Sequence, residues 1–123
     1  MSKLVLVIED DPDQRRLLER MLLGSGWRVA TAPDGESGLN AAKSHPPDAI
    51  VLDVMMPRLN GYQTCRQLKA DPATAPIPVV MCTSKDQPAD EFWATEVGAE
   101  AFLAKPVDIG RLIQILDRLT ERT

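Results

Sequence analysis

The chain has 123 residues and a net charge of -4 at pH 7, and its 44% hydrophobic and 26% charged residues are ordinary for a soluble globular protein. This length suits one domain with a substantial buried core. A nucleic-acid-binding surface is normally basic, so the negative charge argues against that function. No apolar stretch reaches the roughly 18 residues that a membrane span needs, and no signal peptide precedes the first apolar run. We therefore expect a single domain over residues 1–123 in the cytoplasm, without binding to nucleic acid or membranes.

Apolar runs alternate with helical patterns along the chain, which is typical of a parallel sheet covered by helices. The runs predict five short strands, at about residues 3–9, 28–32, 49–53, 77–82 and 101–104. The patterns between and after them predict five helices, at about residues 12–23, 35–44, 62–70, 88–97 and 109–119. The first strand is aliphatic throughout and is expected to be buried on both faces, whereas the second is more polar and suits an edge of the sheet.

The first helix has a clear predicted start and a clear predicted face. Asp11 suits the N-cap, Pro12 the first helical position, and Gln14 the third position of a capping box. The apolar side chains at helical spacing predict an inward stripe made of Leu17, Leu18, Met21 and Leu22. The charged side chains between them are expected to face water, namely Arg15, Arg16, Glu19 and Arg20.

Charged or hydroxyl side chains follow four of the predicted strands. The acids 9–11 come after the first strand, Asp53 closes the third, Thr83 follows the fourth and Lys105 follows the fifth. Ligands of parallel α/β sheets bind outside the carboxyl ends of the strands, at the point where the strand order reverses. We therefore expect these side chains to share one site.

The residue types at these strand ends predict a particular chemistry. Clustered carboxylates repel one another unless a cation is present, and an oxygen-only donor set without His or Cys favours Mg²⁺ or Mn²⁺. Thr83 can offer a hydroxyl group, and Lys105 a fixed positive charge, to a phosphoryl group. An Asp carboxylate is an attested nucleophile for phosphorus. Together these groups indicate phosphoryl transfer.

This set of residues resembles the receiver domains of two-component response regulators. The matching features are the acids after the first strand, Asp53 with Pro57 and Gly61 downstream, Thr83, and Lys105 followed by Pro106, in this order and spacing along the whole chain. The resemblance implies a flavodoxin-like fold with strand order 2-1-3-4-5 and helices on both faces. It also implies a signalling function. The chain would accept a phosphoryl group from a sensor histidine kinase, a phosphotransfer domain or acetyl phosphate, and would not act as an enzyme beyond its own phosphoryl transfer and hydrolysis.

The resemblance assigns metal and tuning roles to individual residues. Asp10, the acceptor Asp53 and the backbone carbonyl of Met55 would ligate Mg²⁺ or Mn²⁺ directly, and Glu9 would act through water. The side chains of Met55 and Lys85 occupy the positions that tune how fast water removes the phosphoryl group. An apolar Met cannot hold an attacking water, so we expect slower self-dephosphorylation than in a variant with Asn at this position. For Lys85 two placements remain as alternatives, an ion pair near the site and a position exposed to solvent.

The resemblance also predicts how a signal leaves the site. Thr83 and Lys105 would bind the phosphoryl oxygens, and the peptide bond after Lys105 is expected to be cis. Phe102 falls at the switch position, where an aromatic ring moves inward once Thr83 follows the phosphate. The output face would comprise the fourth helix, fifth strand and fifth helix, for a target protein or a second copy in a homodimer. Of Phe92 and Trp93, one is expected to pack and the other to be an exposed docking aromatic.

Several alternatives remain beside this interpretation. A haloacid-dehalogenase-type phosphatase would need an acid two residues after the nucleophile, where Met55 stands. A nucleotide-binding module would need a glycine-rich loop in place of the acids after the first strand. A phosphorylation-independent interaction module usually lacks one of the site residues, all of which are present here. Asp11 is interpreted as a helix cap rather than a ligand, and Cys65 and Cys82 as packing residues.

The pattern after Leu119 shows no output domain, so we expect the effect to be exerted by docking on another protein, as in stand-alone chemotaxis receivers. Three segments resemble receivers of pilus-based twitching and phototaxis systems, namely residues 82–85, 92–93 and 104–106. A receiver excised from a longer regulator is the alternative.

Overall fold

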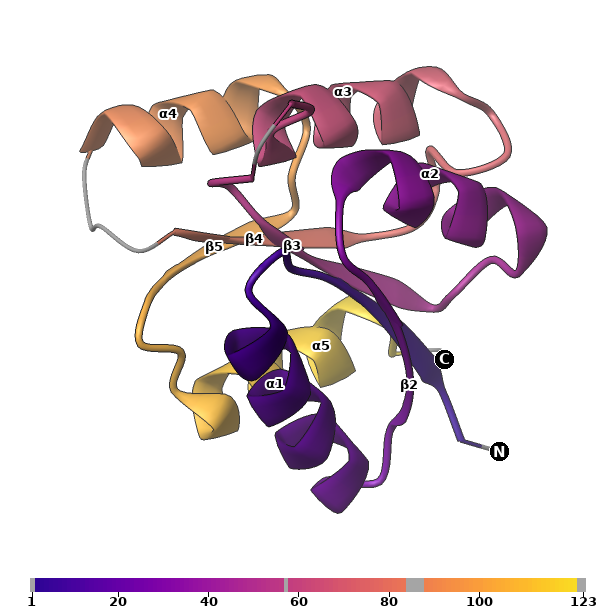
Figure 1. Ribbon diagram of the computed structural model, residues 1–123, viewed down its shortest axis with the longest axis vertical. Coiled ribbons are helices and arrows are strands. Elements are labelled where there is room, and N and C mark those ends of the chain that lie inside the picture. The colour runs from indigo at the N-terminus through magenta and orange to yellow at the C-terminus, as the bar shows by residue number, and fades with distance from the viewer. Residues whose placement is uncertain (1, 57, 84–87, 122–123) are drawn as a thin grey trace.

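A five-stranded parallel sheet lies between two layers of helices in the computed structural model, which describes residues 2–56, 58–83 and 88–121 (Figure 1). Within these residues the strands are β1 (Leu4–Ile8), β2 (Arg28–Ala32), β3 (Ala49–Asp53), β4 (Val79–Thr83) and β5 (Ala101–Ala104). The helices are α1 (Pro12–Gly24), α2 (Gly35–Ser44), α3 (Gly61–Ala70), α4 (Pro88–Glu96) and α5 (Ile109–Leu119). The order β2-β1-β3-β4-β5 confirms the flavodoxin-like prediction.

Each face of the sheet has its own core, because successive residues of a strand point to opposite sides. In β1, Leu6 and Ile8 join the core under α2, α3 and α4, whereas Val5 and Val7 join the core under α1 and α5. The same division of helices is visible in Figure 1. The central strand β3 is buried at every position, and β2 lies at an edge with its first residue exposed, as predicted. Among the described residues, no helix is long and apolar enough to cross a membrane.

The start of α1 differs from the prediction in one respect. Asp11 is the N-cap, and its side chain accepts a hydrogen bond from the backbone N–H of Asp13. The predicted capping box is wrong, because the backbone N–H of Asp11 donates to Glu9 Oε2 at 3.2 Å. The side chain of Gln14 instead donates from Nε2 to Asp11 Oδ2 at 3.1 Å, which leaves its oxygen available for another donor. A complete capping box forms at the start of α3, between Asn60 and Gln63.

The predicted inward stripe of α1 is only partly correct. Leu18 and Leu22 are buried, but Leu17 is 54% exposed, because it lies at the side of the helix that faces the β5–α5 loop rather than the sheet. Arg15 also differs from the prediction that it faces water. It is half-buried and donates hydrogen bonds to the backbone carbonyls of Glu9 (2.9 Å) and Asp10 (3.4 Å). Arg15 thereby ties α1 to the loop that carries the acids.

Candidate functional site

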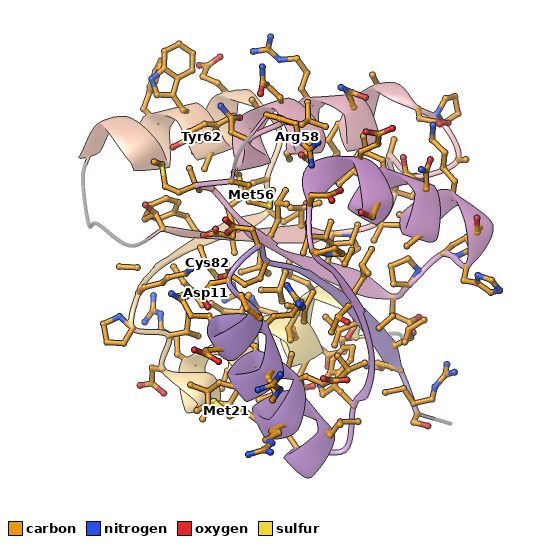
Figure 2. All side chains as sticks on the ribbon, viewed as in Figure 1. Asp11, Met21, Met56, Arg58, Tyr62 and Cys82 are labelled. Carbon is orange, nitrogen blue, oxygen red and sulfur yellow. The ribbon has the colours of Figure 1, made fainter. Side chains whose placement is uncertain are left out.

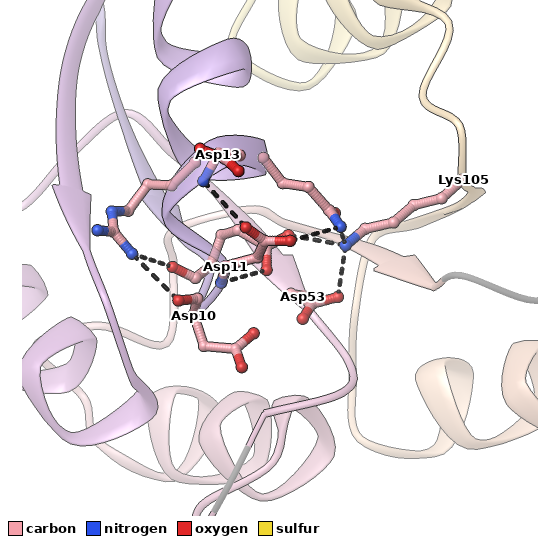
Figure 3. Close-up of polar contacts among 8 residues, drawn as sticks. Asp10, Asp11, Asp13, Asp53 and Lys105 are labelled. Atoms are coloured by element: carbon pink, nitrogen blue, oxygen red, sulfur yellow. Dashed lines mark hydrogen bonds and ion pairs between the residues drawn. The ribbon is translucent and has the colours of Figure 1, made fainter.

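The acids after β1 and the acid at the end of β3 lie together at the carboxyl edge of the sheet (Figure 3). Ile8 is the register partner of Leu52, so Glu9 and Asp53 come next on neighbouring strands. One carboxylate oxygen from each of Glu9, Asp10 and Asp53 lies within 4.8 Å of the others. Glu9 is 2% and Asp53 is 5% exposed. Two nearly buried carboxylates at this distance require compensating positive charge.

Lys105 supplies part of that charge. Its Nζ lies 2.7 Å from Glu9 Oε1 and 3.0 Å from Asp53 Oδ1, and it also donates to Gln14 Oε1 at 2.6 Å (Figure 3). The backbone N–H of Lys105 donates to the carbonyl of Thr83 at 2.6 Å, which fixes the start of the β5–α5 loop. The peptide bond that follows Lys105 is cis, as predicted.

The pKa values of both nearly buried carboxylates are raised in spite of the lysine. Burial raises the pKa of Asp53, the hydrogen bond and charge of Lys105 offset only part of this rise, and the charge of Asp10 adds to it. Burial also raises the pKa of Glu9, and the hydrogen bond from Lys105 again offsets only part of the rise. Burial alone would lower the pKa of Lys105, but its hydrogen bonds to Glu9 and Asp53 outweigh this effect, so its pKa is raised. Two nearly buried carboxylates therefore share one ammonium group, with a third acid nearby.

This donor set fits a hard divalent cation. The three clustered groups are all carboxylates, which Mg²⁺ and Mn²⁺ prefer as ligands. Asp10 is half-buried and therefore more accessible to a hydrated ion than the nearly buried Glu9 and Asp53. Asp11 is not among the clustered acids and acts as the cap of α1, as predicted, at the end of the helix next to the sheet edge (Figure 2).

Thr83 lies at the same edge of the sheet. It is 2% exposed, ends β4 and is the register partner of Ala104, the residue before Lys105. On the neighbouring strand, Asp53 is the register partner of Cys82. The structure therefore brings together all four strand ends that the sequence singled out. Met55 has a 67% exposed side chain.

The predicted positions for switching and output have mixed outcomes. Phe102 is half-buried and packs against the core beneath α2, α3 and α4. The expectation that either Phe92 or Trp93 packs inward is wrong, because they are 56% and 49% exposed. The two rings contact each other edge to face, with their centroids 5.4 Å apart. The small residue Ala94 takes the inward position of α4 instead. Lys85 and Pro57 lie outside the described residues.

A cavity of about 490 Å³, which the sequence does not predict, lies between α1 and the β5–α5 loop and is lined in part by Lys105. Its walls include Gln14, Leu17 and Met21 from α1 and Lys105 and Pro106 from the loop. The spacing of the α1 residues was the available signal, since positions i, i+3 and i+7 share one face of a helix. The sequence predicts that Leu17 and Met21 belong to the inward stripe, whereas both line this cavity.

Both cysteines are buried, as predicted, and we expect them to be unreactive in the native protein. Burial raises the pKa of Cys65 to about 11 and that of Cys82 to about 12. At neutral pH the thiolate fraction of each is therefore no more than about one in ten thousand. A colorimetric thiol reagent should label neither cysteine in the folded protein and both after denaturation. Rapid labelling of one thiol under native conditions would contradict this expectation.

Comparison with known proteins identifies the family. The response regulator receiver domain model matches residues 5–117, so the chain belongs to this family of two-component signalling proteins. It is 38% identical to the protein PilH of Pseudomonas aeruginosa, over 92% of this chain and 93% of that one. It is 45% identical to the response regulator PleD of Caulobacter vibrioides, over 88% of this chain but only 24% of PleD.

The solved structures agree with this membership. The receiver domain of the sensor histidine kinase PA1611 from Pseudomonas aeruginosa superposes with a TM-score of 0.91, covering 99% of this chain and 100% of that domain at 29% identity. That structure holds a magnesium ion coordinated in its active site cleft.

Proposed function

We propose that this chain is a phosphorylation-dependent receiver whose acceptor is Asp53. A sensor histidine kinase or phosphotransfer domain would donate the phosphoryl group in the presence of Mg²⁺ or Mn²⁺. The observation that carries the proposal is the nearly buried Asp53 carboxylate, held at 3.0 Å from Lys105 and flanked by Glu9 and Asp10. Membership of the receiver family supports this assignment. The chain would perform no catalysis beyond its own phosphoryl transfer and hydrolysis.

The residues present fit the metal that this function requires. Asp10 and Asp53 would hold Mg²⁺ directly together with the carbonyl of Met55, and Glu9 would act through water. When bound, the ion supplies positive charge that offsets the charge of the cluster and of the incoming phosphoryl group. The carboxylate-only cluster supports this reading, as does the magnesium ion in the cleft of the PA1611 receiver domain.

The transfer step uses an oxygen of Asp53 as the nucleophile. Its lone pair forms a bond to phosphorus while the bond to the donor nitrogen of a phosphohistidine, or to the acetate oxygen of acetyl phosphate, breaks. The departing group takes the electron pair of that bond. Thr83 and Lys105 would hold the phosphoryl oxygens, so Lys105 exchanges its contact with Asp53 Oδ1 for a contact with the new group.

The output would pass through the face formed by α4, β5 and α5. Phosphorylation adds roughly 1.5 to 2 negative charges, by analogy with phosphoserine. Thr83 would follow the phosphoryl group, and the half-buried Phe102 on β5 would turn inward in response. The exposed aromatic pair Phe92 and Trp93 on α4 gives this face apolar area for a target protein. A second copy of the chain is the alternative occupant.

The similarity to PilH covers almost all of both chains, and it supports the narrower proposal of a receiver in a chemotaxis-like, twitching or phototaxis pathway. We propose that this receiver domain acts by docking on a partner protein. The three sequence segments that resemble receivers of twitching and phototaxis systems favour the same pathways.

Beryllofluoride, which mimics a phosphoryl group on a carboxylate, tests the proposed function. With Mg²⁺ we expect it to shift the amide NMR signals of the carboxyl strand ends and of the residues around Phe102. Asp53→Asn should abolish these shifts, whereas Asp13→Asn, which removes an exposed acid at the start of α1, should preserve them. If the wild type does not respond, the proposed function fails, and a phosphorylation-independent interaction module becomes the favoured alternative.

Replacing Met55 with asparagine should shorten the lifetime of the phosphoryl group. Its side chain is 67% exposed beside the acceptor, so the change should leave the fold intact. An amide can hold a water that attacks phosphorus, which a thioether cannot. We expect the rate of dephosphorylation to rise by about tenfold, corresponding to one positioned hydrogen bond. Phosphoprotein decay followed with Met55→Leu as the control checks this, and an unchanged lifetime in Met55→Asn would rule it out.

A further inference from the structure

Gln14 links the cap of α1 to the lysine of the phosphoryl site. It stands in the first turn of α1, and its Oε1 accepts a hydrogen bond from Lys105 Nζ at 2.6 Å. Its Nε2 donates to Asp11 Oδ2 at 3.1 Å. The ammonium of Lys105 therefore has three acceptors, of which two are the carboxylates of Glu9 and Asp53 and the third is neutral.

The orientation of the Gln14 amide follows from its neighbours. Asp11 offers only acceptors, and its Oδ1 already accepts from the backbone N–H of Asp13 as the cap of the helix. The NH₂ group of Gln14 must therefore face Asp11, and its carbonyl oxygen must face the ammonium of Lys105. The opposite orientation would place two donors together and two acceptors together. The helix cap thus fixes which atom of Gln14 meets the lysine.

We propose that Gln14 is a positioning residue. It holds the Lys105 ammonium in place while that group exchanges its contact with Asp53 Oδ1 for a contact with the incoming phosphoryl group. This inference rests on the proposed function, since Lys105 must leave Asp53 Oδ1 when that carboxylate reacts. A neutral acceptor from α1 keeps the ammonium at the mouth of the site without adding charge to a cluster that already holds three acids. Without it, only the two carboxylates hold the ammonium, and Asp53 is then less available as a nucleophile.

The matched variants are Gln14→Met, which keeps the length of the side chain and removes the acceptor, and Gln67→Met, which makes the same change at an exposed position of α3. Because Gln14 is exposed, its replacement should leave the thermal midpoint unchanged. We expect Gln14→Met to slow phosphorylation by acetyl phosphate, and to weaken beryllofluoride binding, by about fivefold, the size of one partly exposed hydrogen bond to a charged group. Gln67→Met should match the wild type in both measurements.

A double-mutant cycle separates positioning from a general effect on the helix. In a Lys105→Met background, Gln14→Met should cause no further loss of beryllofluoride affinity, because the residue through which it acts is absent. Equal losses in both backgrounds would overturn the proposal. If Lys105→Met does not fold, the ¹⁵N–¹H signal of the Lys105 ammonium provides a second test. This signal should shift and exchange faster with water in Gln14→Met but not in Gln67→Met, and an unchanged signal in Gln14→Met contradicts the proposal.

These measurements also distinguish a failure of the proposed function from a failure of the role proposed for Gln14. If the wild-type protein neither binds beryllofluoride nor accepts a phosphoryl group, the proposed function fails. If the wild type responds and Gln14→Met responds equally well with an unaltered Lys105 signal, the proposed function stands and the role of Gln14 alone is rejected.

Discussion

Replacing Lys105 with methionine will destabilise the metal-free protein by about 2–4 kcal/mol at neutral pH. The change removes the cation that contacts both Glu9 and Asp53, which are 2% and 5% exposed, and so leaves two nearly buried carboxylates close to Asp10 without their partner. The expected cost is somewhat below that of breaking a fully buried pair, because the Lys105 side chain is 15% exposed. Chemical denaturation in the presence of a chelator measures this loss.

The pH dependence of the same variant has a defined sign. In the folded wild type the pKa values of Glu9 and Asp53 lie above those in the unfolded chain, so the folded state binds more protons and stability falls as the pH rises from about 4 through the folded values. Lys105→Met removes a hydrogen bond and a charge that lower these pKa values, so this fall becomes steeper and extends to higher pH. The raised pKa of Lys105 gives the wild type a contribution that is present below about 10.5 and is lost as the pH rises further, and the variant lacks it.

Magnesium should recover much of the stability that Lys105→Met loses, because a dication at the cluster replaces the missing charge. The matched control is Lys43→Met, which removes a partly exposed ion pair with Asp71 and should change stability by less than about 0.5 kcal/mol with no added response to Mg²⁺. If Lys105→Met were as stable as the wild type without metal across this pH range, the electrostatic description of the site would be wrong.

Replacing Gly61 with alanine will destabilise the protein by about 2–4 kcal/mol and displace the acceptor. Gly61 begins α3, and its N–H donates to the carbonyl of Val54 at 2.9 Å. A Cβ at this position would collide with the carbonyl oxygen of Asp53 and lie 2.7 Å from Cα of Val54, which are backbone atoms that cannot rotate away. The helix must therefore move outward or the end of β3 must shift, and either change disturbs Asp53.

Gly24→Ala is the matched control for this prediction. Gly24 is the last residue of α1, and a Cβ there would meet nothing within 4 Å. Alanine should therefore be neutral or stabilise α1 by up to about 1 kcal/mol, from its higher helix propensity. Thermal unfolding of both variants, together with the amide NMR signal of Asp53, checks the comparison. Equal stability of the two variants would show that α3 does not press against the end of β3.

Much of the fold and of the site was predictable, because both depend on patterns that are visible in the sequence itself. The continuous aliphatic run of β1 predicted a strand buried on both faces, and the strand order followed from the family resemblance. The acids, Thr83 and Lys105 each stand directly at a strand end, so parallel strands bring them to one edge regardless of how the helices pack.

The errors concern side chains whose partners come from distant segments. Gln14 matched a local capping pattern, yet the competing partner Lys105 lies 91 residues away and is brought close only by the β5–α5 loop. Leu17 fits an apolar stripe, but the position of that same loop leaves it exposed. Phe92 and Trp93 are hydrophobic, but α4 buries Ala94 instead, and the turn after the helix buries Val97. Local sequence patterns therefore do not predict the partners or the exposure of these side chains.

The mass of the intact protein after incubation with acetyl phosphate tests the account most directly. With Mg²⁺ present, the wild type should gain one phosphoryl group, and it should gain none when a chelator removes the metal. Asp53→Asn should remain unmodified under both conditions, while Asp13→Asn should behave as the wild type. No gain of mass in the wild type, or an equal gain in Asp53→Asn, would contradict the assignment of Asp53 as the phosphoryl acceptor.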